Sequence, residues 1–202
     1  MNKILSIFAM IILISSCGTS KKAKTLIENQ NTIRIDFNNY LEAITNKEFS
    51  KSMDYIVPEF FEIFPKEQMI KVMEQTFNNP EMEFELKEPK ILEIGKIKKV
   101  NERFYSKLRY SNLMNMKFKG EEEETEEEKK MRNNLMKLSF EQTFGSENVE
   151  YNSEADFFQI YSEKEVIAIS DNGKTEWKFL VVEEKQKFIL EKLVPEEVIK
   201  MK

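Results

Sequence analysis

The spacing of the apolar residues changes at Pro80, and this change limits the folds that the chain can adopt. Ahead of Pro80, apolar residues recur at steps of three and four, which is the spacing of one face of a helix. Beyond it, Met82, Phe84 and Leu86 alternate with charged residues, which is typical of a strand with one buried face. Helices followed by strands, rather than the two in regular alternation, predict an α+β fold.

Two helices are predicted ahead of Pro80. The first runs from about Thr32 to Thr45 and turns five apolar side chains to one side, namely Ile33, Phe37, Tyr40, Leu41 and Ile44. The second runs from Lys66 to Phe77, because Pro65 suits the first turn of a helix, where its missing N–H has no partner to lose. An aromatic group lies between the two helices and consists of Phe60, Phe61 and Phe64.

The region after Pro80 is predicted to form an antiparallel sheet. Its strands are expected at Met82–Lys87, Lys90–Val100, Phe104–Phe118, Phe157–Tyr161, Val166–Ile169, Trp177–Val182 and Lys187–Lys192. The segment Asp171-Asn172-Gly173 predicts a tight turn, because Asn and Gly tolerate positive φ. A short terminal helix is predicted after Pro195.

One helix is predicted to interrupt these strands. Seven glutamates surround Thr125 within residues 121–128, and Thr125-Glu126-Glu127-Glu128 matches a capping box at a helix start. Acidic residues in the first turn also suit the positive end of the helix dipole. The helix is expected to reach about Phe144 and to stop at Gly145. Because the glutamate run lacks the spaced Asp, Asn and Gly of a calcium loop, no metal site is predicted.

The composition excludes several classes of function. The chain has no histidine, which rules out Ser-His-Asp catalysis and imidazole metal sites, and a single cysteine, which rules out an internal disulfide. The net charge of -5 disfavours nucleic acid as a partner, since phosphate binding needs a concentrated basic surface. The five glycines are not clustered into a phosphate-binding loop, so no cofactor is predicted.

The first seventeen residues have the layout of a secretory signal. Lys3 is the positive start, and the mostly apolar run Ile4–Ile14 ends at two serines. This run is shorter than the ~20 apolar residues that span a bilayer, so cleavage is expected rather than a permanent anchor. The segment Ile14-Ser15-Ser16-Cys17 resembles the lipobox of bacterial lipoproteins, in which an aliphatic and two small residues precede a cysteine.

This resemblance implies that Cys17 carries lipid. Its thiol would take a diacylglyceryl group, the chain would be cut ahead of it, and the new amine would accept a further acyl chain such as palmitate. An ordinary signal peptide is the alternative. Gly18 in place of an aspartate favours the outer membrane, with the protein facing the periplasm or the exterior. The predicted organisation is a signal peptide at 1–16, a lipidated tether at 17–31 and one α+β domain at 32–202.

The order of the elements also resembles the cystatin-like cone of ketosteroid isomerases and nuclear transport factor 2. The resemblance rests on helices that precede a meander and on the closing Trp177-Lys178-Phe179-Leu180 strand. It implies that the helices pack on one face of a curved sheet whose open mouth binds an apolar ligand or holds a catalytic aspartate. The chain departs from the pattern, because three strands precede its second helical segment.

Candidate site residues follow from the cone. Asp54, beside Tyr55, is the first candidate for a carboxylate whose pKa burial would raise, and Asp36 is the second. Three further residues are candidates to line a pocket, and they are Tyr105, Arg109 and Tyr110.

Three functions stay open at this stage. The expected one is a non-enzymatic lipoprotein that binds an envelope protein or an apolar small molecule. The second is an isomerase or hydrolase that uses a buried carboxylate. The third is a purely structural envelope protein with an exposed apolar patch of several hundred Å² and no cavity.

Overall fold

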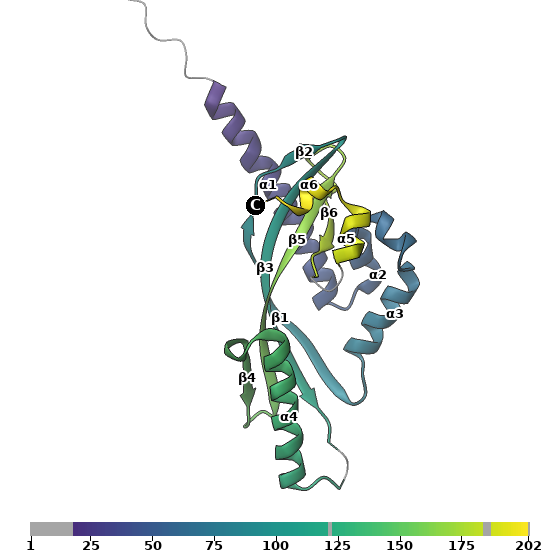
Figure 1. Cartoon of the computed structure of the whole chain (residues 1–202), viewed down its shortest axis with the longest axis vertical. Coiled ribbons are helices and arrows are strands. Elements are labelled where there is room, and N and C mark those ends of the chain that lie inside the picture. Colours follow the sequence, from purple (N-terminus) through teal and green to yellow (C-terminus); the bar gives the residue numbers. More distant parts are fainter. Residues whose placement is uncertain (1–17, 121–122, 184–186, 202) are drawn as a thin grey trace, which may run out of the picture.

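The computed structural model describes residues 18–120, 123–183 and 187–201, and it describes side chains from Glu28 onward. The elements follow in the order α1 (Gly18–Thr45), α2 (Phe49–Ser52), η1 (Met53–Tyr55), η2 (Pro58–Glu62), α3 (Lys66–Phe77), β1 (Met82–Ile94), β2 (Lys98–Val100), β3 (Arg103–Phe118), α4 (Glu126–Phe144), η3 (Ser146–Asn148), β4 (Val149–Asn152), β5 (Phe157–Ser170), β6 (Lys178–Val181), α5 (Lys187–Leu193) and α6 (Glu196–Ile199). Figure 1 shows their arrangement. The six strands form one antiparallel sheet, so the predicted α+β class is confirmed.

Strands β3 and β5 form the spine of the sheet. They pair without a register shift from Phe104 opposite Ser170 to Met116 opposite Phe158. Strands β1 and β2 lie along the other side of β3. The outer side of β5 is shared by two short strands, because β4 pairs with residues 157–160 and β6 with residues 166–169. The long spine gives the molecule two ends, with β6 near one end and β4 near the other (Figure 1).

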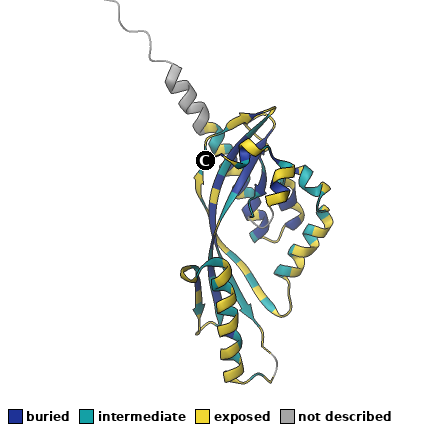
Figure 2. Ribbon diagram, in the orientation of Figure 1, coloured by how far each residue is buried: buried dark blue, intermediate teal, exposed yellow. Residues whose placement is uncertain are grey.

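Helices cover the two ends of the sheet differently. At the β6 end, α1 packs on one face against Leu108 and Tyr110, while α5 and α6 pack on the other face beside Tyr105. At the β4 end, α4 packs on one face, where Phe140 lies against Phe158 with ring centroids 5.3 Å apart. Figure 2 accordingly shows the buried residues concentrated at the β6 end.

Trp177 joins the loop before β6 to α1. Its side chain is fully buried, and its indole Nε1–H donates to Thr32 Oγ1 at 3.0 Å. Its backbone N–H donates to the Asp36 carboxylate, also at 3.0 Å. Burial raises the pKa of Asp36 above its ordinary value, and the hydrogen bond from Trp177 only partly opposes this effect.

The raised pKa of Asp36 predicts a pH-dependent difference between the wild type and Asp36→Asn. Folded protein binds this proton more tightly than unfolded protein, so ionisation of Asp36 destabilises the fold as pH rises from its ordinary pKa of 3.8 towards the higher folded value. The asparagine keeps an acceptor for Trp177 but does not ionise. The unfolding free energy of Asp36→Asn relative to wild type should therefore rise with pH across this window. Urea titrations at several pH values measure it, and parallel pH profiles would contradict the assignment.

Several predicted elements are found in place. Helix α3 spans Lys66–Phe77, the long strand β3 reaches Phe118, and α6 follows Pro195. The capping box of α4 is formed in both directions, since the Glu128 N–H donates to Thr125 Oγ1 and the Thr125 N–H donates to Glu128 Oε2. Gly145 ends that helix with φ 90°. These predictions are confirmed.

The predicted strand at Lys187–Lys192 is wrong, because these residues belong to α5. The alternation of the sequence does not decide the structure here. Ile189 and Leu190 are both buried although they are consecutive, and Leu190 packs in the cluster that also contains Leu180 and Val198. Packing on the second face of the sheet therefore overrides the local pattern.

Three predicted boundaries are also wrong. Helix α1 begins at Gly18 rather than Thr32, and the Gln30 side chain already donates to the backbone oxygens of Ile94 and Gly95 at 3.1 and 3.0 Å. The segments Phe157–Tyr161 and Val166–Ile169 are one continuous strand, β5. Strand β1 continues through Pro89 and ends at Ile94.

Pro89 marks an irregularity in β1, the edge strand on the far side of the sheet. The pairing with β3 shifts register between Lys87 and Lys90, and Glu88 has φ 50°. A bulge, a proline and flanking charges are the features by which proteins stop an edge strand from pairing with other chains. The β1 edge is therefore protected.

The predicted turn at Asn172-Gly173 is present, within a longer loop between β5 and β6. Gly173 has φ 69°, and a Cβ added there would lie 2.6 Å from the Phe104 ring. We expect Gly173→Ala to lower the unfolding free energy by about 2–4 kcal/mol, because it combines backbone strain with overpacking. Urea unfolding measures the change. Lys174→Ala in the same exposed loop is the control and should be near neutral; an equally small effect of Gly173→Ala would contradict this account.

Candidate binding site at the edge of strand β5

Within residues 18–120, 123–183 and 187–201, a stretch of β5 has no neighbouring strand on its outer side. Pairing with β4 ends at Ile160, and pairing with β6 begins at Val166. Among the described residues beyond β6, only Val182 makes a backbone hydrogen bond to this stretch, where its N–H donates to the Glu165 carbonyl at 2.8 Å. We call the open edge at Tyr161–Glu165, with the walls on either side of it, the β5 notch.

The notch is an open cavity of about 830 Å³. One wall comes from the end of α4 and from η3, and the other from Val182 and Glu183, which directly follow β6. Its lining consists of Thr143, Phe144, Asn148, Tyr161, Ser162, Glu163, Lys164, Glu165, Val182 and Glu183. This volume lies within the range of ligand-binding cavities.

The backbone of the notch presents hydrogen-bonding groups to the outer side of the sheet. In an antiparallel strand, the N–H and C=O of one residue point to the same side, and successive residues alternate. The Glu165 carbonyl points outward, because it accepts from Val182. Glu163 and Tyr161, two and four residues earlier, therefore direct their N–H and C=O outward as well. Within the described residues, no backbone partner meets those of Glu163.

The charged side chains of the notch are already paired. Glu163 accepts from Tyr161 Oη at 2.6 Å and lies 3.4 Å from Arg109 Nη1. The hydrogen bond to Glu163 raises the pKa of Tyr161. Lys164 lies 2.8 Å from Glu183, and another pair at 2.8 Å joins Lys107 to Glu165. The side chains thus leave little net charge to attract a charged ligand.

Polar residues are buried in the sheet behind the notch. Ser111, Asn112 and Ser162 are 5, 5 and 6% exposed, and Asn112 lies directly opposite Ser162. Asn112 Oδ1 has no hydrogen-bond partner among the described residues. Asn112 and Ser162 lie on the face that carries the apolar clusters under α1 and under α4, so they separate the two halves of that core, whereas Ser111, opposite Glu163, faces the other side. The notch opens where this core is interrupted.

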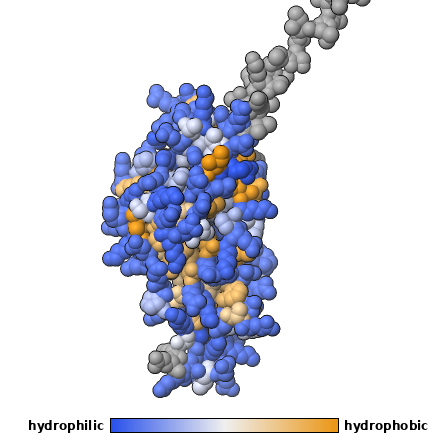
Figure 3. All heavy atoms as spheres, turned by 180° about the vertical axis from the view of Figure 1, so that it is seen from behind, coloured by the Kyte–Doolittle hydropathy of each residue, from blue (hydrophilic) through white to orange (hydrophobic). Residues whose placement is uncertain are grey.

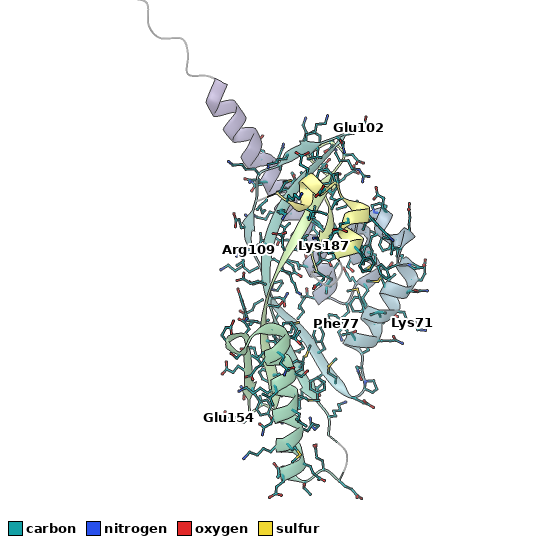
Figure 4. All side chains as sticks on the ribbon, in the orientation of Figure 1. Lys71, Phe77, Glu102, Arg109, Glu154 and Lys187 are labelled. Carbon is teal, nitrogen blue, oxygen red and sulfur yellow. The ribbon has the colours of Figure 1, made fainter. Side chains whose placement is uncertain are left out.

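The structure does not gather the predicted pocket residues into one site. Tyr105 and Tyr110 are both buried, but they face opposite sides of the sheet and belong to different clusters. Burial raises the pKa of Tyr110 to about 12. Tyr55 packs beside the α1 cluster. Arg109 alone contacts the notch, through Glu163, and Figure 4 labels it beside the middle of the sheet.

Neither candidate aspartate forms a catalytic site. Asp54 is the wrong choice for a buried carboxylate, because its side chain is 67% exposed and pairs with Lys66 at 2.7 Å. Asp36 does have a raised pKa, but its carboxylate accepts from the Trp177 backbone and is not among the lining residues of the β5 notch. The carboxylate on which an enzymatic function would rest is therefore not in place at either position.

A second, polar hollow lies at the start of α4, with a volume of about 540 Å³. Asn133, which is 7% exposed, donates to Tyr151 Oη at 2.6 Å, and Tyr151 donates to Asp156 at 2.6 Å. Lys129 pairs with the same aspartate at 2.8 Å. These bonds tie α4 to the β4–β5 turn, so we assign the hollow a structural role.

Exposed apolar side chains are mostly scattered. Figure 3 shows that apolar residues on one face lie mainly across its middle, among hydrophilic ones. Among the side chains that the structure describes, only α4 carries more than one large exposed apolar residue, and these are Met131, Leu135 and Leu138 at 67, 63 and 55% exposure. They form a stripe along the outer side of that helix.

Sequence reasoning missed the notch. The available signal was the polar run Ser162-Glu163-Lys164-Glu165 between two apolar segments, which predicted an interruption between strands. Cys17, the predicted lipid attachment site, lies outside the described residues.

Comparison with known proteins adds no assignment, since no family model, curated protein or solved structure matches the chain. Among the described residues, no helix has the length and apolar character to cross a bilayer. Within the same residues, no group of three or more Asp, Glu or Cys side chains is arranged to hold a metal ion.

Proposed function

We propose that the protein is a lipoprotein of the bacterial cell envelope whose domain binds a partner protein without catalysing a reaction. Acylated Cys17 would hold it to the bilayer, and the outer membrane is favoured. The observation that carries the proposal is the Ile14-Ser15-Ser16-Cys17 segment at the end of a short apolar run. The β5 notch supports the binding role, because it combines a cavity with outward-facing backbone groups.

The position of α1 agrees with anchoring at residue 17. The helix begins at Gly18, directly after the predicted lipid, and its 28 residues span about 42 Å. Figure 1 shows its N-terminal turns projecting from one end of the molecule, with α4 at the opposite end. A lipid at Cys17 would therefore leave the notch and α4 directed away from the membrane.

The cystatin-like cone stays a prediction. The packing of α1 on one face of an antiparallel sheet supports it. The covering of the other face by α5 and α6 gives this sheet a second helical layer, which the prediction did not include.

Labelling with a fatty-acid analogue tests the anchor. We expect wild-type protein to incorporate the label at Cys17 and Cys17→Ala to incorporate none, because the thiol is the nucleophile that accepts the diacylglyceryl group. Mass spectrometry of the mature N-terminal peptide should then show an acylated cysteine as its first residue. An acyl-free mature chain would refute the proposal.

A further inference from the structure

We propose that the β5 notch binds a short extended segment of a partner protein by strand addition, so that the segment fills the gap between β4 and β6. The proposal deepens the partner-binding role suggested above and rests on it. Its basis is the outward backbone of Glu163, which meets no backbone partner among the described residues, in a cavity of about 830 Å³.

The arrangement of the backbone groups selects the class of ligand. The outward N–H and C=O groups of Tyr161 and Glu163 repeat at every second residue along one line. Pairing with β3 along the whole stretch holds them in position. An extended polypeptide repeats its own donors and acceptors at the same spacing, which is the basis of strand addition at sheet edges. A compact small molecule does not present hydrogen-bond donors and acceptors repeated at this spacing.

The length of the gap limits the segment. Four residues, Tyr161-Ser162-Glu163-Lys164, lie between the last residue paired with β4 and the one opposite Val182. At ~3.3 Å per residue this corresponds to about 13 Å of strand. The bound segment is therefore about four residues long.

The side chains around the gap favour an uncharged, apolar segment. Phe144 and the small Ser162 border it on the α4 side of the sheet, and Val182 and Tyr161 border it on the other. An inserted segment would thus meet an apolar or aromatic side chain on each face. The charged groups are already engaged with one another, so a charged segment would have to break an existing pair.

The two edges of the sheet differ in a way that agrees with this assignment. The β1 edge carries a bulge and Pro89, which oppose pairing with another chain. Residues 161–164 contain neither a proline nor a register shift. The sheet is therefore open to strand addition at β5 and protected at β1.

The test compares Glu163→Pro with Glu163→Ala in the full chain purified in detergent. Proline removes the outward N–H of Glu163 but leaves the pairing with β3 intact, because that N–H does not face β3. Alanine removes the side chain and keeps the N–H. The probe is the tightest binder selected from a displayed library of short random linear peptides. We expect its affinity to fall by at least about tenfold in Glu163→Pro and to change by less than about threefold in Glu163→Ala.

Hydrogen exchange on the wild type gives a readout that needs no variant. Bound peptide should slow exchange at the amides of Tyr161 and Glu163 and leave the exposed helix α4 around Leu135 unchanged. Circular dichroism and the urea midpoint show whether Glu163→Pro is folded; if it is not, the exchange result alone decides.

Four results would overturn the proposal. One is a library that yields no binder, and another is a peptide that protects α4 rather than the notch. The third is a peptide that binds folded Glu163→Pro as tightly as wild type. The fourth is a dimer that Glu163→Pro abolishes, which would assign the notch to a second copy. A peptide bound elsewhere removes the notch assignment but leaves the partner-binding role, and fatty-acid labelling tests the anchor independently.

Discussion

Exchanging residues 1–17 for a secretory leader that lacks a cysteine is expected to move the protein from the membrane fraction to the soluble fraction. A single acyl chain binds a bilayer with an association constant of roughly 10⁴ M⁻¹, and each buried methylene contributes ~0.8 kcal/mol. Two or three chains on Cys17, as proposed, would therefore give stable attachment, and their loss should reduce membrane partitioning by several orders of magnitude. Fractionation followed by quantitative immunoblotting measures the shift from almost all membrane-bound to almost all soluble.

The matched control exchanges only the residues ahead of Ile14, so that Ile14-Ser15-Ser16-Cys17 is kept behind the new leader. This chain should remain in the membrane fraction. Simple Cys17→Ala is less informative for fractionation, because a chain that is not lipidated is expected to keep its apolar leader. If the cysteine-free exchange stays membrane-bound, another part of the chain provides the attachment and the lipid anchor is refuted.

Local interactions explain why α4 was predicted closely from the sequence. Its start depends on Thr125 and Glu128, which are three residues apart, and its end depends on the positive φ of Gly145. Neither feature needs information from distant parts of the chain. The first helix was less well predicted because its amphipathic pattern begins at Ile33, whereas the backbone is helical from Gly18. The helical turns ahead of Ile33 show no regular spacing of apolar residues from which a helix could be predicted.

Interactions between distant segments explain the error at α5. Lys187–Leu193 carries apolar residues that suit either a strand or a helix. The local sequence does not indicate that this segment packs on the second face of the sheet. The predicted pocket failed for a simpler reason. Tyr105 and Tyr110 are an odd number of residues apart on one strand, so regular alternation places them on opposite faces.

The β5 notch could not be predicted from the sequence alone, because it is defined by which strands are missing beside it. The run Ser162–Glu165 is polar, which is compatible with a loop between two strands or with an uncovered stretch of one strand. Only the pairing of β5 with β3 along its whole length distinguishes these cases. The notch thus follows from the lengths and positions of β4 and β6, which are set by contacts far apart in the chain.

Trp177→Ala is expected to cause the largest loss of stability of any single substitution considered, at about 3–5 kcal/mol of unfolding free energy. The side chain is fully buried in the cluster beneath α1, together with Phe37 and Phe179. Its removal leaves a large cavity and also deletes the Nε1–H donor that reaches Thr32. Because single domains are stable by only ~5–15 kcal/mol, this substitution should bring the domain close to unfolding. Urea titration followed by circular dichroism measures the loss without relying on tryptophan fluorescence.

Two further variants separate the causes of that loss. Trp177→Phe keeps most of the apolar volume and removes the indole donor, so it should lower the unfolding free energy by less than Trp177→Ala. The difference between the two losses measures the contribution of the cavity. Phe188→Ala also deletes a large aromatic ring, but that ring is 57% exposed, so its cost should stay within ~0.5 kcal/mol. If Trp177→Ala cost no more than Phe188→Ala, the loop before β6 would not be docked on α1. An undocked loop would also leave Asp36 less buried, and burial is the cause of its raised pKa.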